Sequence, residues 1–134
     1  MDWLSGMNKI IAIIEENLTG DIDYRRLSQV VGCSVFEFSK IFSFMAGVPV
    51  SEYVRRRRLS QAAFDLQSGG KKVIDIALKY GYESPTAFAR AFRELHGIPP
   101  SSAKLPGAVL KTYPPISFLL TIRGVSAMEF RMQQ

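Results

Sequence analysis

The chain has 134 residues, a length that fits one compact domain or one domain with a fragment of a second. Hydrophobic residues make up 47% of it, which is enough for a core and excludes an intrinsically disordered protein. The formal net charge of +5 favours an anionic partner such as nucleic acid or a membrane surface.

The cysteine count and the hydropathy of the sequence narrow the possible classes of protein and cellular locations further. Cys33 is the only cysteine, so the sequence excludes an internal disulfide and a cysteine metal cluster and favours a reducing, cytoplasmic location. No apolar run reaches the roughly 18 residues that a membrane-spanning helix requires, and the first residues do not resemble a secretion signal. We therefore expect no membrane partner.

Apolar residues at helical spacing predict a first helix over residues 7–18. Asp23 is placed to cap a short second helix over residues 24–31, and Gly32 is placed to end it. A short helix followed by a turn is the first half of a helix-turn-helix unit.

A third helix is predicted over residues 34–46, where Ser34 and Glu37 have the spacing of a capping box. The apolar residues of this helix, at i, i+3, i+4 and i+7, predict a buried stripe. They are Phe38, Ile41, Phe42 and Met45. The two short helices together predict a helix-turn-helix unit.

A long helix is predicted over residues 50–67, which would form a rod of roughly 27 Å. It contains the run Arg55-Arg56-Arg57-Arg58. Successive helical residues are rotated by about 100°, so these arginines cannot share one basic face. We expect some of them to pair with carboxylates, the candidates being Asp65, Asp75 and Glu94; a phosphate contact by one arginine is the alternative.

The second half of the chain repeats the first at an offset of fifty residues. Ser34, Phe38, Lys40 and Phe42 match Ser84, Phe88, Arg90 and Phe92, and Gly47-Val48-Pro49 matches Gly97-Ile98-Pro99. The repeat predicts a second helix-turn-helix unit from a helix over residues 73–80, a turn at Gly81 and a helix over residues 84–96. A short helix begins at Pro99-Pro100.

The outward faces of the helices over residues 34–46 and 84–96 are the candidate DNA-binding surfaces. A helix fits the major groove of DNA, and an arginine can contact guanine through two hydrogen bonds, so Arg90 is the best candidate for base recognition. Helix N-termini at Ser34 and Ser84 are candidate phosphate sites. The outward residues are Phe36, Ser39, Lys40, Ser43, Thr86, Ala89, Arg90 and Arg93.

Two of these residues have a simpler alternative. Phe36 could contact a thymine methyl group or pack against the preceding helix, and Lys40 could bind DNA or be only a solvated charge. Successive major grooves on one side of DNA lie about 34 Å apart. A rod of roughly 27 Å with its end loops could hold two recognition helices at that separation, which predicts double-stranded DNA as the partner.

The tail has a different pattern. Apolar and polar residues alternate over 116–123 and again over 128–133, with Gly124 between them, which predicts a β-hairpin. We therefore divide the chain into a DNA-binding domain, residues 1–106, and a linker and hairpin, residues 107–134. The hairpin would be the start of a truncated second domain, and its exposed edge could form a homodimer.

No set of residues predicts an enzyme, a metal site or a cofactor. His96 is the only histidine and is expected at the surface near a helix C-terminus, and Cys33 is expected to be a small buried hydrophobic residue. No phosphate loop and no zinc-ligand spacing is present. The alternative to DNA binding is a helical protein-interaction module or an effector-sensing fragment.

These residues resemble the AraC/XylS family of bacterial transcription regulators over roughly residues 7–105. The resemblance is carried by Ile74-Asp75-Ile76-Ala77, Gly81-Tyr82, Ser84, Phe88, Arg90, Phe92, Gly97-Ile98-Pro99-Pro100 and, in the long helix, Arg58-Leu59 and Ala62. It implies an all-α fold of seven helices with two helix-turn-helix units on a linker helix, and RNA polymerase as a further candidate partner. It also implies DNA contacts from Val35, Phe36, Ser39, Lys40, Pro85, Thr86, Ala89 and Arg90.

The tail resembles the first hairpin of a GyrI-like effector-binding domain. The match rests on Leu110-Lys111-Thr112-Tyr113-Pro114-Pro115, Gly124 and Met128. It implies that a longer chain binds a small-molecule effector.

Overall fold

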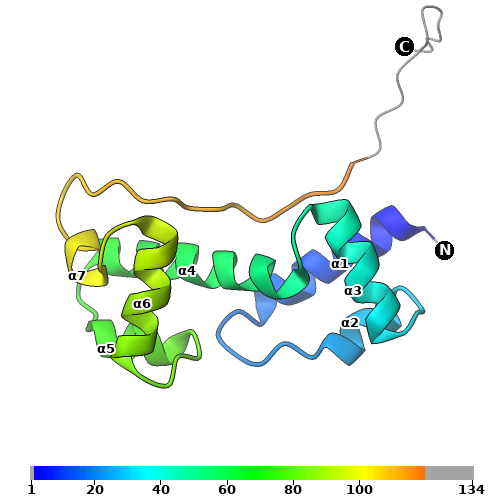
Figure 1. Cartoon of the computed structure of the whole chain (residues 1–134), viewed down its shortest axis with the longest axis horizontal. Helices are drawn as coiled ribbons and strands as arrows, with labels where there is room; N and C mark the ends of the chain where they lie inside the picture. The colour runs from blue at the N-terminus through cyan, green and yellow to red at the C-terminus, as the bar shows by residue number, and fades with distance from the viewer. Residues whose placement is uncertain (1, 120–134) are drawn as a thin grey trace, which may run out of the picture.

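The computed structural model describes residues 2–119. Seven α-helices and no strand lie within this range. A long helix, α4, lies across the middle of the molecule, with α1–α3 at one end and α5–α7 at the other (Figure 1). The helices are α1 (Trp3–Glu16), α2 (Tyr24–Val30), α3 (Val35–Ala46), α4 (Val50–Ser68), α5 (Val73–Lys79), α6 (Pro85–His96) and α7 (Pro100–Ala103).

Side-chain caps set the beginnings of several helices. The first helix begins at Trp3, earlier than the predicted residue 7, because the Asp2 carboxylate accepts the N–H groups of Leu4 and Ser5 at 3.1 and 3.2 Å. The prediction used only the apolar stripe and missed this cap. The predicted caps at Asp23, Ser34 and Ser84 are confirmed.

The two turns between paired helices use equivalent glycines. Gly32 and Gly81 have φ angles of +71° and +84°, a left-handed conformation that residues with a Cβ adopt only at an energetic cost. Each glycine directly follows the C-cap of its helix, so each turn is sharp and brings the next helix across the last.

Two separate hydrophobic cores hold the molecule together. The first packs α1–α3 against the N-terminal half of α4, and the second packs α5–α7 against its C-terminal half. Phe38 and Phe42 in the first core are fully buried, as are their equivalents Phe88 and Phe92 in the second. The repeat in the sequence is therefore a repeat in packing.

The prediction of a β-hairpin is wrong for the part of it that the structure describes. Residues 116–119 are extended but form no strand, and residues 120–133 of the predicted hairpin lie outside the described range. Residues 108–119 instead run back along α4 from α7 toward α1 (Figure 1). Phe118 is buried in the first core, which explains the apolar positions in this stretch.

His96 is also placed differently from the prediction. Its imidazole is only 5% exposed, and Nε2 lies 3.0 Å from the carbonyl oxygen of Leu59. The backbone N–H of Lys111 donates to Nδ1, so Nε2 carries the proton and donates to Leu59. The chain that returns along α4 covers this side of the helix end, where we expected solvent.

None of the helices in residues 2–119 combines the length and the apolar composition that would let it cross a membrane.

Candidate nucleic-acid interface

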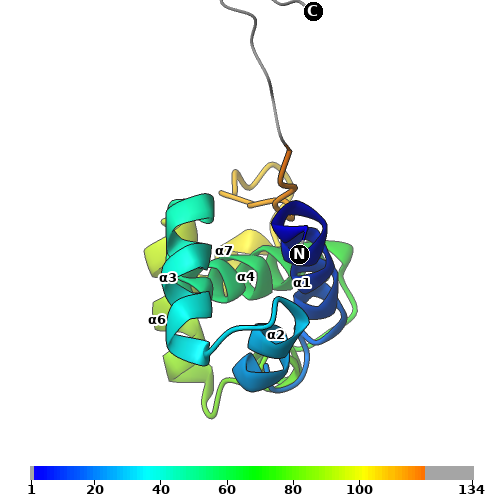
Figure 2. The same ribbon diagram turned by 90° about the vertical axis from the view of Figure 1, so that its right-hand side faces the viewer.

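The helices α3 and α6 lie on the same side of the molecule. Seen along the length of α4, both lie to one side of it and run in the same sense (Figure 2), while Figure 1 places them at opposite ends of α4. The 19 residues of α4 span roughly 28 Å. The length of α4 is of the same order as the separation of about 34 Å between successive major grooves on one side of DNA.

The exposed side of α3 contains the predicted residues. Phe36 is 71% exposed, so its ring does not pack against the preceding helix. The Nζ of Lys40 lies 5.0 Å from the centre of this ring, within the range of a cation–π contact. Ser39 and Ser43 are half-buried, and Val35 is exposed.

The exposed side of α6 is more basic. Thr86, Arg90, Arg93 and Pro85 are exposed, and Ala89 is half-buried beside them. Neither arginine forms an ion pair with any residue in the described range. Both guanidinium groups are therefore available to an anionic partner.

The N-termini of the two helices differ in charge. At α3, the Glu37 carboxylate accepts the N–H and Oγ–H of Ser34, so this helix start already holds a negative group. At α6, Ser84 Oγ accepts the N–H of Ala87 at 3.1 Å and the first turn has no acidic residue. The N-terminus of α6 is thus the better place for a phosphate.

The four arginines of α4 point in different directions, as the helical rotation predicts. Arg55 donates to Glu94 of α6 at 2.9 Å and Arg56 to Glu52 at 3.0 Å. The predicted pairing of an arginine with Glu94 is confirmed. The prediction is wrong for Asp65, which instead pairs with lysines, and within residues 2–119 Asp75 forms no ion pair.

The other two arginines bond to the first bundle, which comprises α1–α3 and their loops; the second bundle comprises α5–α7. Arg57 is 5% exposed and makes two hydrogen bonds of 2.8 Å to the carboxylate of Glu15 in α1. Arg58 donates to the carbonyl oxygens of Leu18 and Gly20 at 3.0 and 2.6 Å. These partners belong to distant parts of the chain, so helical spacing alone could not identify them.

Asp65 holds α5 against α4. Its carboxylate accepts hydrogen bonds of 2.8 Å from Lys79 Nζ and from the Tyr80 hydroxyl. Burial alone would raise the pKa of Asp65, but these two hydrogen bonds together with the positive charges of Lys79 and Lys71 outweigh burial and lower it. Burial and the hydrogen bond to Asp65 raise the pKa of Tyr80 to about 12, so its hydroxyl remains a donor near neutral pH.

Phe44 belongs to the exposed surface of α3 but was not predicted. It is 89% exposed and follows Lys40 by one helical turn. The signal that could have identified it is its position outside the apolar stripe, since a large apolar residue on a wet helix face often marks a contact site.

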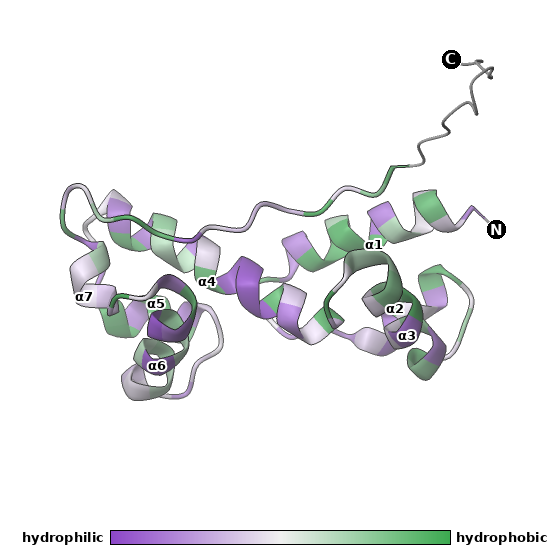
Figure 3. Cartoon of the chain, turned by 45° about the horizontal axis from the view of Figure 1, so that its top comes forward, coloured by the Kyte–Doolittle hydropathy of each residue, from purple (hydrophilic) through white to green (hydrophobic). Residues whose placement is uncertain are grey.

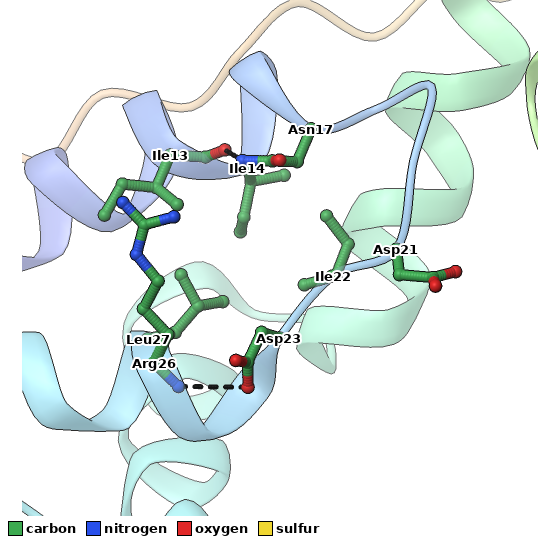
Figure 4. Close-up of a pocket in the computed structure, with 8 residues that line it drawn as sticks. All are labelled: Ile13, Ile14, Asn17, Asp21, Ile22, Asp23, Arg26 and Leu27. Carbon is green, nitrogen blue, oxygen red and sulfur yellow. Dashed lines mark hydrogen bonds between the residues drawn. The ribbon is translucent and has the colours of Figure 1, made fainter.

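A cavity of about 40 Å³ lies between α1 and α2 (Figure 4). Ile14, Ile22 and Leu27 form its apolar wall, and Asp21 and Arg26 lie at its edge. Small-molecule sites usually have volumes of about 300–1,000 Å³, so this cavity is too small for an organic effector.

Known proteins are similar in sequence to the helical part of this chain. A family model described as a helix-turn-helix domain matches residues 27–104. The transcriptional activator AarP of Providencia stuartii is 38% identical over 99 residues, which cover 74% of this chain and 73% of AarP. The HTH-type transcriptional regulator YbfP of Bacillus subtilis is 36% identical over 76% of this chain, which spans only 35% of YbfP.

Solved structures share the fold. A probable AraC family transcriptional regulator from Rhodopseudomonas palustris superposes with a TM-score of 0.67 at 25% identity, over 75% of this chain and 94% of that one. The DNA-binding domain of AdpA, solved with a target DNA, has a TM-score of 0.64 at 24% identity over 72% of this chain and 86% of that one, which shows likeness of fold. The fold and the paired exposed helices define a class, the double helix-turn-helix DNA-binding regulators. The chain belongs to the AraC-type helix-turn-helix family of transcription regulators.

Proposed function

We propose that this chain recognises a DNA sequence by placing α3 and α6 in two successive major grooves on one side of the duplex. The observation that carries the proposal is the position of two equivalent helices, with repeated sequences, on the same side of one long helix (Figure 2). Exposed side chains on both helices support it, because base edges are read only by groups that reach the groove floor.

The proposed roles differ between the two helices. Arg90 contacts guanine O6 and N7, and Thr86 and Ala89 allow the helix to approach the bases closely. Arg93 and the N-terminus of α6 contact phosphates, where Ser84 can contribute its hydroxyl and Pro85, which has no N–H, contributes only van der Waals contact.

On α3 the proposed contacts are more apolar. Phe36 packs against a thymine methyl group or a sugar edge, with Val35 beside it. Lys40 binds a phosphate or a base, and Ser39 and Ser43 donate hydrogen bonds to the backbone. Because Lys40 lies against the Phe36 ring, the two side chains would enter the groove together.

The remaining partners are proposals from the resemblance. AarP is named a transcriptional activator, so activation through contact with RNA polymerase is the proposed result of binding. Residues 1–106 form the proposed DNA-binding domain, and residues 107–134 lead to a GyrI-like effector-binding domain in a longer chain. A homodimer through the tail is a separate proposal, which a monomer in sedimentation at high concentration would remove.

Selection of bound sites from random duplex DNA, followed by titration at two salt concentrations, tests the function. Each phosphate contact releases a counterion, so we expect a recovered consensus and an affinity that falls steeply as salt increases. No binding to any duplex at low salt would contradict the proposal and favour a protein-interaction module.

A further inference from the structure

Residues 108–118, which we call the strap, run beside α4 from the second bundle to the first (Figure 3). At the second bundle, the Lys111 backbone N–H donates to Nδ1 of the buried His96 at 3.1 Å. Leu110 and Tyr113 pack against the second core. The strap therefore begins with a fixed attachment to the end of α6.

The middle of the strap is bonded to α4. The Tyr113 backbone N–H donates to Oγ of Ser60, a fully buried serine, at 2.8 Å, and the Tyr113 carbonyl accepts from Arg57. The Arg56 guanidinium lies 4.7 Å from the centre of the Tyr113 ring. One strap residue thus meets three side chains from the central turns of α4.

The far end of the strap is attached to the first bundle. The hydroxyl of Tyr53 accepts the Ile116 N–H at 3.2 Å. The Asn8 side chain of α1 pairs with both backbone groups of Phe118, at 2.9 and 2.8 Å. The Phe118 ring is 7% exposed and lies 6.4 Å from the ring of Phe42 in α3.

The strap connects two cores that otherwise share α4. Long helices are rarely straight, and any change in the curvature of α4 would change the separation of α3 and α6. A second connection beside α4, attached at both ends, opposes that bending. The strap does not lie on the side of the molecule that carries α3 and α6, so it is not placed to contact DNA itself (Figure 2).

We propose that the strap is a positioning segment that fixes the distance between the two recognition helices and thereby sets the spacing of half-sites that the chain accepts. The inference rests on the proposed function, since it concerns how the same two helices meet DNA. Its physical basis is effective concentration: once one helix is bound, a rigid connection holds the other at its groove.

Substitutions at the far end of the strap test the proposal in the full chain. Phe118→Ala removes the ring from the first core, and Asn8→Ala removes two hydrogen bonds without emptying the core. The matched controls are Leu119→Ala, whose side chain is 81% exposed, and Ser5→Ala on the exposed side of α1. Circular dichroism confirms that each variant is folded.

The first measurement uses duplexes recovered by selection, with both half-sites, with one half-site, and with one or two base pairs added between them. We expect Phe118→Ala and Asn8→Ala to bind the two-site duplex about tenfold more weakly and one half-site as the unaltered chain does. Their preference for the selected spacing should also become weaker. Controls should match the unaltered chain, and an unchanged spacing preference in both test variants would overturn the proposal.

The second measurement needs no DNA. Spin labels at Gln29 in α2 and Leu78 in α5, both exposed, report the distance between the two bundles in a Cys33→Ser background. We expect a broader distance distribution in Phe118→Ala and Asn8→Ala than in Leu119→Ala. An unchanged distance distribution would contradict the proposed positioning role of the strap, even if DNA binding is confirmed. A broadened distribution would support that role, even if the chain fails to bind DNA.

Discussion

Arginine serves two purposes in this protein, and its hydrogen-bond partners distinguish them. Arg55, Arg57 and Arg58 each donate to groups in other helices or loops, so their guanidinium groups are used within the fold. Arg90 and Arg93 have no ionic partner in residues 2–119 and extend from the side of α6 that we propose meets DNA. The local density of positive charge alone would have selected the arginine run of α4 as the DNA-binding surface, although those arginines bond within the fold.

Substitution of Arg90 by alanine is expected to weaken binding by about 1–3 kcal/mol and to relax the preference at one base pair, because a bidentate contact to guanine is lost. Competition binding with duplexes altered one base pair at a time measures this. Lys111→Ala is the matched control, since it removes an exposed charge from the strap while keeping the backbone N–H that His96 accepts. Equal weakening on every sequence would mean that Arg90 contacts only phosphate.

His96 should make the stability of the fold depend on pH. Burial lowers the pKa of the imidazole below its ordinary value of 6.5, and the hydrogen bond to Leu59 only partly opposes this. The unfolded chain therefore binds a proton near pH 6.5 while the folded chain does not. Stability is fully present above that pH and decreases as the pH falls toward the lowered folded value.

The expected slope is at most about 1.4 kcal/mol per pH unit, the limit for one proton. Urea unfolding at pH 7.5 and at pH 5.5 measures it. His96→Gln is the control, because it removes the only histidine and should remove most of the difference between these two conditions. A chain equally stable at both values would show that His96 titrates alike when folded and unfolded.

At the scale of the helices, α4 acts as both a connector and part of each core. Its residues Leu59, Ala62 and Ala63 are fully buried in the second core, while Tyr53 and Val54 belong to the first. The polar arginine run lies between these two apolar stretches. Polar groups can lie there because Arg55, Arg57 and Arg58 find partners on other helices or loops, while Arg56 pairs with Glu52 one turn earlier in α4.

Glu15→Gln is expected to lower the free energy of unfolding by about 2–4 kcal/mol, because it leaves the buried Arg57 without its counter-charge. Glu52→Gln makes the same chemical change where the paired arginines are each about a third exposed, and should cost less than about 1 kcal/mol. Urea denaturation of the two variants compares them. Similar losses would mean that the Arg57–Glu15 pair adds nothing beyond a surface ion pair.

At the scale of the whole molecule, the proposed function makes the two bundles a pair of DNA-reading units in one polypeptide. The arrangement matches what a helix-turn-helix dimer achieves with two chains, in which half-sites lie one turn apart. Here α4 and the strap fix the geometry, whereas in a dimer an interface does. The spacing of half-sites should therefore be as specific as their sequence.

An insertion of about 5 base pairs between half-sites would turn one of them to the opposite side of the duplex. We expect the affinity of the unaltered chain to fall to that for one half-site, because α4 cannot twist by half a turn. A second insertion, to about 10 base pairs, should not restore binding, since the grooves would then lie about twice as far apart. Recovery at the full turn would indicate a flexible connection between the bundles.

Local sequence was sufficient to predict the seven helices of residues 2–119, apart from the start of α1, and most of the exposed residues of α3 and α6. Patterns of a few residues were enough to predict the helix caps at Ser34 and Ser84, the turn glycines and the buried phenylalanines. The repetition of these patterns after fifty residues identified two equivalent units. The exposure of Phe36 and Arg90 followed from the same helical periodicity.

Only the tertiary structure decided the burial of His96, the partner of Arg57 and the path of the tail. Each depends on contacts between segments far apart in the chain: His96 with Lys111, Arg57 with Glu15, and Asn8 with Phe118. An alternating pattern such as that of residues 116–119 indicates that one side of an extended chain is apolar. It does not indicate whether that side packs against another strand or, as here, against the first hydrophobic core.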